Sequence, residues 1–563
     1  MAEDAPTLLP GHFEKLSDEM SAAVLAYLNL PPLGCYADRE EPPALGSDLA
    51  FEIPAPARLA LLSRRESLGG FASPADLIGI PGFGKTDLDA LTERLGDLRR
   101  YGQRLRPVWG GPEAEAEFFR LLESAEKYIH IQMYIIGGEV GLRMARLLVR
   151  KKRQGVKVRI LFTASGFVIS GSPSGTGFVN RLSRLRSYLY NDRYVRKLIV
   201  RELVESGVPL VDSAPIGRHW RRSALRAQGV KNRDAYTKWA RERDLPDAWV
   251  EQQQRIDKQC ALGFSNVDHR KMIVVDGKRA FIGSMNLADS YLYQNELSHD
   301  PRVNVRRWQW HDNAAILDGG CIADLNQQFA ERWALSGGDF FDHNDSFYTP
   351  PPERVGHAAV TIVKSIPGMV SLPMKKNLGR FVLSMLGADL RPQTVGNNPI
   401  RRRVQQLPEL ANNDFYVEHC YPSDAELLAH WTEYAVKLSD FTMVVPLHYD
   451  TRLLGLECDR FYPEMIAAGA RLQGFNRAIM HSKIAVADGF YVSTGSYNLN
   501  LRSARADLEM QFFVQDRSFG EAVRGHIVAD LEECQPIKPG PLDRIRSRVS
   551  LPLFDAFFRY FFL

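Results

Sequence analysis

Cysteine is scarce in this sequence, and its distribution is not that of a metal site or a disulfide framework. The six cysteines of the 563-residue chain stand singly, and no C-x-x-C pair occurs. Such usage is typical of a protein in a reducing compartment. The net charge of +4 is too small by itself to indicate nucleic-acid binding. We therefore predict a cytoplasmic protein that uses no metal and no other cofactor.

Long apolar segments are also absent. No run of about 18 apolar residues is present that could cross a bilayer as a helix. Residues 1–6 lack the basic start of a secretory signal peptide, and no apolar core follows them. With 45% apolar and 25% charged residues, the composition is that of a globular protein. We predict two or three folded domains and no transmembrane segment.

One arrangement of polar residues occurs twice in the chain. In the first copy, His269, Lys271 and Asp276 precede the tetrapeptide Gly283-Ser-Met-Asn286. The second copy starts at His481 and has the same residue types at the same spacings. Its further members are Lys483, Asp488, Gly495, Ser496 and Asn498. One copy could be a buried strand with a polar start, but two copies indicate a shared site.

These residue types suit the cleavage or transfer of a phosphodiester without a metal. Histidine can act as a nucleophile and as an acid because its pKa lies close to neutrality. Lysine offers a charge that stabilises the additional negative charge of the transition state. Because side chains alternate along a strand, we expect His269 and Lys271 on one face, and likewise His481 and Lys483.

The other motif residues have predicted supporting roles. The Gly-Ser-x-Asn turns offer hydroxyl and carboxamide groups to the phosphate, from Ser284, Asn286, Ser496 and Asn498. Asp276 and Asp488 fall on the opposite strand face and are predicted to brace a turn. Each histidine also needs an acid on its second ring nitrogen to set its tautomer. The candidates for these acids are Asp312 and Glu509.

An α/β pattern begins after about residue 105. A β-rich run at 128–136, an amphipathic helix at 141–154 and a second strand at 156–162 predict a βαβ unit. The second half repeats this order, with a polar, Pro-rich linker at 336–353. We predict an N-terminal helical domain, residues 1–105, and two related α/β domains, residues 106–345 and 346–563.

The N-terminal domain contains a candidate helical hairpin. Ser73 and Asp76 predict a capping box around Pro74, and Gly82 and Gly84 permit a tight turn before a helix at 86–95. This pattern resembles a helix-hairpin-helix module, whose turn amides often hold a DNA phosphate. A nucleic-acid partner and a protein partner both remain open for residues 1–105, and so does a spacer role.

Two other segments could contact a membrane. Residues 218–243 combine many basic residues with Trp220, Tyr236 and Trp239. They suit phospholipid headgroups, a nucleic-acid backbone or a solvated charged hairpin. Residues 551–563 are rich in aromatic residues and too short to span a bilayer. They could lie in a membrane interface or fill a groove of the core.

The paired H-x-K-x4-D-x6-G-S-x-N motifs resemble those of the phospholipase D superfamily, closest to its bacterial cardiolipin synthase-like branch. Trp310-His-Asp312, residues 325–333 and residues 498–509 are also similar to that branch. The resemblance implies a duplicated phospholipase D-type α-β-α-β-α sandwich with both motifs at the interface. It also implies a covalent phosphohistidine, with His269 as nucleophile and His481 as acid and base. Gly283-Ser284 departs from the Gly-Gly that is frequent in the first motif of that branch.

The leading functional prediction is a phosphatidyl transferase or phospholipase D. Its substrate would be a phospholipid at a membrane surface, with the protein peripheral on the inner membrane. The alternative enzyme is a metal-independent nuclease of the same superfamily, which the hairpin and the basic insertion favour. A non-catalytic lipid- or DNA-binding scaffold is the alternative of another class, but both motifs are intact.

Overall fold

The structure is a computed structural model that describes most of the chain. The described residues are 6–29, 55–163, 198–213, 225, 228–230, 233–259, 268–292, 309–365, 398–449, 452–505 and 507–538. The aromatic segment 551–563 and Trp220 of the basic insertion lie outside them. The predictions made for those segments therefore stay predictions.

The first half of the chain builds a seven-stranded sheet. Its strand order is β1-β8-β6-β5-β2-β3-β4, with β2, β3 and β4 parallel and the other pairs antiparallel. The bounds in that order are Arg104–Trp109, Asn313–Asp318, Arg279–Gly283, Met272–Val275, Tyr128–Met133, Lys157–Phe162 and Leu210–Asp212. The parallel β2–β3 pair, joined by helix α7 (Gly138–Arg153), confirms the predicted βαβ unit.

The second half builds an eight-stranded sheet with the same plan. Read from the other end, its order is β9-β16-β15-β14-β10-β11-β12-β17. The bounds in that order are Ala359–Ser365, Glu509–Gln515, Tyr491–Gly495, Lys483–Ala487, Asp414–His419, Asp440–Pro446, Arg471–Phe475 and Cys534–Pro536. Seven strands match those of the first sheet in order and direction, and β17 is an addition at the edge.

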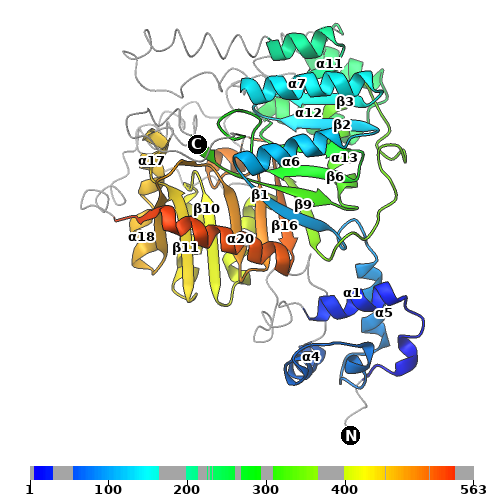
Figure 1. Cartoon of the computed structure of the whole chain (residues 1–563), viewed down its shortest axis with the longest axis vertical. Helices are drawn as coiled ribbons and strands as arrows, with labels where there is room; N and C mark the ends of the chain where they lie inside the picture. Colours follow the sequence, from blue (N-terminus) through cyan, green and yellow to red (C-terminus); the bar gives the residue numbers. More distant parts are fainter. Residues whose placement is uncertain are drawn as a thin grey trace.

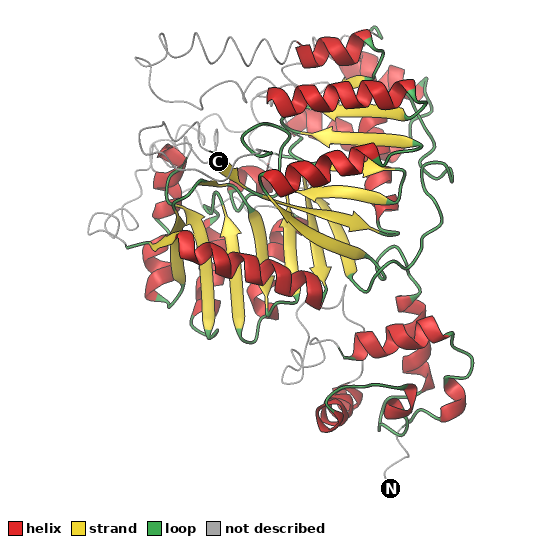
Figure 2. Cartoon of the chain, in the orientation of Figure 1, coloured by secondary structure: helices red, strands yellow, loops and turns green. Residues whose placement is uncertain are grey.

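Helices and sheets stack in five layers, which the arrangement in Figures 1 and 2 makes visible. Helices α6 (Pro112–Glu123) and α7 cover the outer face of the first sheet. Between the sheets, one apolar core includes residues of both sheets and of α13 (Ile322–Leu335) and α20 (Arg517–Asp530). The outer face of the second sheet packs against α15 (Pro399–Gln405), α16 (Ala425–Ala435), α17 (Arg452–Asp459) and α18 (Tyr462–Ala467). The predicted duplicated α-β-α-β-α sandwich is confirmed.

Short backbone contacts join the two halves directly. Strand β7 (Trp310–His311) of the first half pairs in parallel with β13 (Ile479–Met480) of the second half. An isolated bridge links Asp268 to Leu508 in the same way. A short helix, α19 (Leu501–Arg505), follows the second motif. The two repeated motifs therefore meet at the seam between the sheets.

The N-terminal region forms a separate helical cluster with its own apolar core (Figure 1). Its elements are η1 (Pro10–His12), α1 (Asp18–Leu28), α4 (Ala55–Leu68), η2 (Pro74–Leu77) and α5 (Lys85–Leu95). The predicted capping box is present, because the Asp76 carboxylate accepts from the Ser73 amide at 2.7 Å. The helix that follows Ser73 is, however, a single 3-10 turn, since Ile78 already has extended backbone. The structure therefore does not show the first helix of a hairpin.

Two aromatic residues of the basic insertion, Tyr236 and Trp239, are core residues. Tyr236 and Trp239 lie on α11 (Arg233–Arg241), near α12 (Asp247–Gln259), and are 1% and 4% exposed. They pack with Leu225 and with the end of α13. They are thus not available to a membrane surface, because burial in this small core uses their apolar area.

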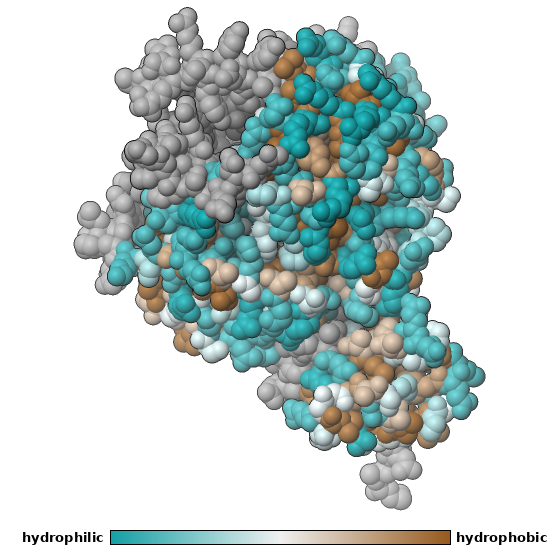
Figure 3. Space-filling view, in the orientation of Figure 1, coloured by the Kyte–Doolittle hydropathy of each residue, from teal (hydrophilic) through white to brown (hydrophobic). Residues whose placement is uncertain are grey.

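The surface in Figure 3 interleaves hydrophilic and hydrophobic residues over the two sheets. Several large exposed apolar side chains belong to the N-terminal cluster, namely Leu9, Leu59 and Leu68. Among the helices of the described residues, none combines the length and the apolar character that crossing a bilayer requires.

Asp276 and Asp488 hold equivalent strand ends in the two halves. Asp276 has a φ of 53°, and its carboxylate accepts from the amides of residues 126, 127 and 128 at 2.7–2.8 Å. Asp488 has a φ of 50° and accepts from the amides of residues 412, 413 and 414 at 2.8–3.0 Å. Each aspartate therefore ties the turn after a motif strand to the start of the neighbouring strand.

We expect Asp276→Ala to lower the free energy of unfolding by about 2–4 kcal/mol, because three charge-assisted hydrogen bonds are lost and alanine disfavours positive φ. Asp244→Ala is the matched control, since Asp244 has a φ of 49° but lies outside the sheets. Thermal and urea unfolding of both variants measure the difference. Equal losses in the two variants would show that only the backbone conformation matters.

Candidate active site

The two motif histidines lie at the seam, and each is held by an acid from the opposite half. His269 precedes β5 of the first sheet, and its Nδ1 lies 3.1 Å from both carboxylate oxygens of Glu509, the first residue of β16. His481 follows β13 of the second half, and its Nδ1 lies 2.7 Å from Oδ2 of Asp312, next to β8. The acids engage Nδ1, so each ring directs Nε2 away from its acid.

The motif serines hold these acids in place. The Ser284 hydroxyl donates to Asp312 and the Ser496 hydroxyl donates to Glu509, whose second oxygen accepts from Ser503 at 2.6 Å. The sequence had assigned Ser284 and Ser496 to the phosphate. In the structure each serine orients the acid that orients the histidine of the other motif, and a phosphate contact of the two serines stays a prediction. A serine–acid–histidine chain thus crosses the seam in both directions.

The motif asparagines are anchored through their side-chain oxygens. Oδ1 of Asn286 accepts from the Ile135 amide at 3.2 Å, and Oδ1 of Asn498 lies 3.2 Å from the Cys420 sulfur. The turn before Asn286 needs glycine, because Gly283 has a φ of 135° and a Cβ there would lie 2.8 Å from the neighbouring strand. A phosphate contact of the two asparagines stays a prediction.

The two lysines differ in their relation to their histidines. Lys483 Nζ lies 3.3 and 3.4 Å from the two ring nitrogens of His481 and donates to the His481 carbonyl at 2.9 Å. Lys271 Nζ donates to the His269 carbonyl at 2.5 Å. His269 and Lys271 precede strand β5 instead of lying within it, so strand alternation is not what places them together.

Burial lowers the pKa values of three basic groups in the site. Burial and Lys271 hold the pKa of His269 well below its usual range, and burial and Lys483 lower that of His481 to about 3. Burial also lowers the pKa of Lys271 to about 7. The site therefore favours neutral imidazoles beside concentrated positive charge, an environment suited to a bound phosphate anion.

The pKa values of the two acids are shifted in opposite directions. Burial raises the pKa of Glu509 to about 7. Burial also opposes the ionisation of Asp312, but the charges of His481 and Lys483 outweigh it and lower the pKa of Asp312. Asp312 therefore stays charged beside His481, whereas Glu509 titrates near neutrality beside His269.

Sequence reasoning missed the aromatic side chains that surround the histidines. Tyr134 packs edge-on against His269, with centroids 4.9 Å apart, and Lys271 lies over its ring at 5.3 Å. His481 is surrounded by Tyr291, Trp310 and Tyr421, at centroid distances of 4.7–6.1 Å. Only Trp310 carried a sequence signal, as the residue two before Asp312.

Two buried ion pairs lie beside His269. Arg502 donates to Asp507 at 2.9 Å, and both charges act on His269. Arg270, between the first motif's histidine and lysine, forms a two-point contact with Asp268 at 2.7 and 2.9 Å. These pairs fix the chain on both sides of His269.

Taken together, two imidazoles with free or nearly free Nε2 atoms, two lysines and two orienting acids form a phosphodiester-transfer site of the two-histidine kind. The model of the family "Cardiolipin synthase, PLD-like domain" matches residues 118–299 and 407–531, more than half of the chain. The chain therefore belongs to this family of the phospholipase D superfamily.

Curated relatives are distant. The probable cardiolipin synthase YwiE of Bacillus subtilis (strain 168) is 22% identical over 442 residues, which are 77% of this chain and 67% of the relative. The cardiolipin synthase of Geobacillus kaustophilus (strain HTA426) is 23% identical over 406 residues, 72% of this chain and 61% of the relative. The chain thus matches about two thirds of the length of these relatives.

Among solved structures, phosphatidylserine synthase of Haemophilus influenzae Rd KW20 superposes with a TM-score of 0.47 at 11% identity. The superposition covers 81% of this chain and 95% of that protein.

Because the two acids differ in pKa, we predict that their substitution changes different limbs of the pH profile of kcat. Asp312→Asn removes a negative charge that favours protonated His481, so the pKa of His481 falls and the alkaline limb moves to lower pH. Glu509→Gln removes a group that titrates near pH 7, so the acid limb should weaken or disappear. Steady-state rates of each variant from about pH 5 to 9 measure this.

A shift of the same limb in both variants would contradict distinct roles for the two pairs. His430→Gln serves as the control, because His430 also contacts a carboxylate, Glu409 at 2.8 Å, but on the outer layer of the second half. Its pH profile should equal that of the unsubstituted protein.

Proposed function

We propose that the protein is a phosphatidyl transferase or phospholipase D that acts on membrane phospholipids through a covalent phosphohistidine. The observation that carries the proposal is the reciprocal pairing of His269 with Glu509 and of His481 with Asp312 across the seam. Family membership supports the same chemistry, and the curated relatives carry the name cardiolipin synthase.

His269 is the better candidate for the nucleophile. Its Nδ1 is held by Glu509, and among the described residues its Nε2 has no hydrogen-bond partner. The lone pair of Nε2 would attack phosphorus, and the bond from phosphorus to the leaving alcohol would break. A neutral imidazole is required for this attack, and burial keeps His269 neutral.

His481 is the candidate for the acid and base. Its proton would pass to the oxygen of the leaving alcohol, and it would then take the proton of the incoming alcohol or water. The substrate's phosphate charge offsets Lys271 and Lys483, so the pKa of His481 rises when substrate binds. Charged Asp312 stabilises the imidazolium that results.

The aromatic side chains around the histidines suit a lipid substrate better than a nucleic-acid duplex. Tyr134, Tyr291, Trp310 and Tyr421 line the ring faces with apolar surface. The nuclease alternative loses support in the N-terminal domain, because the Gly84 amide donates to Asp87 at 2.8 Å and Lys85 pairs with Asp89. We propose a peripheral location at the inner membrane. A partner for residues 1–105 stays a prediction.

A direct comparison of substrates tests the proposal. The purified full-length protein is incubated with vesicles containing labelled phosphatidylglycerol and, separately, with single- and double-stranded DNA, with EDTA added at the start. We expect lipid turnover and no DNA cleavage, because the chemistry uses only side chains of the chain. DNA cleavage without lipid turnover would overturn the proposal in favour of a nuclease.

The covalent step can be trapped with an activated leaving group. Phosphatidyl-p-nitrophenol needs no acid to depart, so His481→Asn should release a burst of about one p-nitrophenolate per chain and then stall. His269→Asn should give no burst, and His430→Gln should turn over normally. Peptide mapping of the His481→Asn protein should locate the acid-labile label on His269. A burst from His269→Asn with the label on His481 would reverse the assignment of the two histidines.

A further inference from the structure

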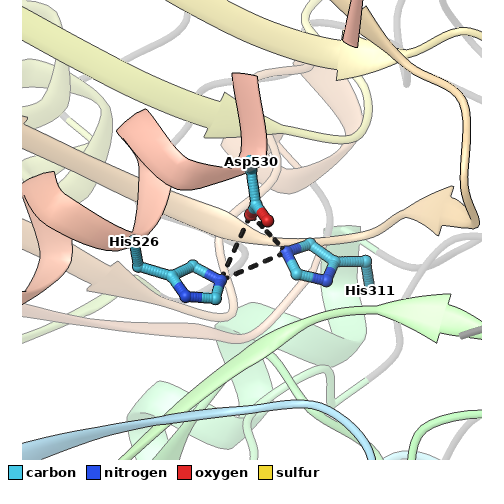
Figure 4. Close-up of side chains that lie close together, drawn as sticks. All are labelled: His311, His526 and Asp530. Atoms are coloured by element: carbon cyan, nitrogen blue, oxygen red, sulfur yellow. Dashed lines mark hydrogen bonds and ion pairs between the residues drawn. The ribbon is translucent and has the colours of Figure 1, made fainter. Parts of the chain in front are cut away.

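A second cluster of histidine and carboxylate side chains lies at the seam, apart from the two motifs. His311 of β7 meets His526 and Asp530 of α20 (Figure 4). The His311 Nε2 atom lies 2.7 Å from Asp530 Oδ2 and 3.5 Å from His526 Nε2. The His526 Nε2 atom lies 3.2 Å from the same Asp530 oxygen. Three potential ligand atoms thus converge on one point.

Local structure explains how these residues meet. His526 and Asp530 are four residues apart on α20, so they lie on one face of the helix. His311 stands between Trp310 and Asp312, which both contact His481, and its side chain is directed to the other side of the strand. One short strand therefore serves the catalytic histidine on one face and this cluster on the other.

A fourth potential ligand is buried beside the three. Glu418 on β10 is 0% exposed, and its Oε2 lies 3.9 Å from His311 Nε2. Within the described residues, neither of its carboxylate oxygens has a hydrogen-bond partner. A buried carboxylate without partners is costly, because it loses its hydration and gains nothing in return. The structure thus leaves a ligand unsatisfied next to three others.

The charges of the cluster are not balanced by lysine or arginine. Across the described residues, the contacts of these four side chains include no cationic side chain other than the histidines themselves. Two carboxylates in one buried place would be stabilised together by a divalent cation.

We propose that His311, His526, Asp530 and Glu418 form a tetrahedral site for a divalent cation of the zinc class, which fastens the two halves of the protein together. Two imidazoles with two carboxylates are a donor set that zinc accepts. With bonds of about 2.0–2.1 Å, the ligand atoms of a tetrahedral site lie about 3.3 Å apart. The four observed separations, 2.7, 3.2, 3.5 and 3.9 Å, lie on both sides of that value.

Aromatic stacking holds both imidazole rings in place. His526 stacks on Trp109 with centroids 3.5 Å apart, and His311 stacks on Phe475 at 4.8 Å. These contacts fix the ring planes, so a cation would need only small side-chain shifts. The site is structural: its link to the active site is the His311 carbonyl, which accepts from the His481 amide at 2.7 Å.

The test measures metal directly and does not depend on the lipid activity. Full-length protein is purified without a polyhistidine tag, stripped with chelator, and dialysed against zinc. We expect on the order of one zinc per chain by elemental analysis. We also expect a melting temperature that rises with zinc concentration, because the cation binds the folded state. Cobalt substituted for zinc should give the visible absorption of a tetrahedral site.

Variants locate the site on these residues. Asp530→Asn and Glu418→Gln keep the shape of each side chain and should weaken zinc binding at least about tenfold, as should His526→Gln. His430→Gln, a control from the histidine–carboxylate pair with Glu409, should bind zinc as the unsubstituted protein does. Circular dichroism establishes that each variant is folded.

Two results would overturn the proposal. One is unsubstituted protein that retains no stoichiometric zinc and whose melting temperature does not respond to zinc. The other is folded Asp530→Asn or Glu418→Gln that binds zinc with unchanged affinity. Because neither readout involves turnover, the proposed lipid chemistry could fail while the metal site stands, and the reverse.

Discussion

The reciprocal hydrogen bonds between histidine and carboxylate across the seam are the constraint on which the site depends. His269 is oriented by Glu509 from the second half, and His481 by Asp312 from the first. Neither half by itself supplies both the histidine and the acid of a catalytic pair. The two sheets must therefore pack in one register, because a shift would separate both buried carboxylates from their histidines. The apolar core shared by both sheets provides that register.

This constraint explains the serines of the motifs. Ser284 and Ser496 direct their hydroxyls to the acids, so each motif positions the histidine of the other one. The departure at Gly283-Ser284 from a Gly-Gly pattern thus has a structural use in this chain, since the Ser284 hydroxyl donates a hydrogen bond to Asp312. Duplication of the fold makes both chains of contacts equivalent, but the choice of aspartate on one side and glutamate on the other makes them chemically different.

The difference in pKa between the two acids supports different catalytic roles for the two histidines. A charged Asp312 favours a protonated imidazole at His481, as an acid requires. Glu509 has a raised pKa and lies beside a histidine that burial keeps neutral, as a nucleophile requires. Burial lowers the pKa of Lys271 to about 7, so a bound anion would favour the charged form of this lysine. The groups that would bind and cleave a phosphodiester are therefore already positioned in the protein without substrate.

Strand β7 connects this site to the rest of the seam. Its alternation places Trp310 and Asp312 at His481, while His311 faces α20 and Glu418. A change in the packing of α20 would therefore change the position of His481, because Asp530 contacts His311 and the His311 carbonyl accepts from the His481 amide. The proposed cation would stiffen this connection, because it would join residues of β7, β10 and α20.

Much of the fold followed from local patterns. Periodicity predicted the first βαβ unit, and the repeated order of elements predicted a duplicated α/β domain, because strands and helices are encoded by spacing within short stretches. The α-β-α-β-α sandwich was expected from the resemblance to the phospholipase D superfamily. Local sequence patterns gave wrong predictions where contacts with distant residues determine the structure. The capping box at Ser73 formed, yet the turn after it is 3-10 and short. Tyr236 and Trp239 look like surface aromatics in sequence but fill a small core.

The sequence by itself determined which chemical groups the site contains, because the motif spacing repeats in both halves and needs no knowledge of packing. It also identified Asp312 and Glu509 as acids without saying which histidine each serves. Only the tertiary structure decided that the pairs cross between halves, that the serines bind the acids, and that His311, Glu418, His526 and Asp530 meet. These contacts join residues far apart in the chain, and sheet packing alone brings such residues within hydrogen-bonding distance.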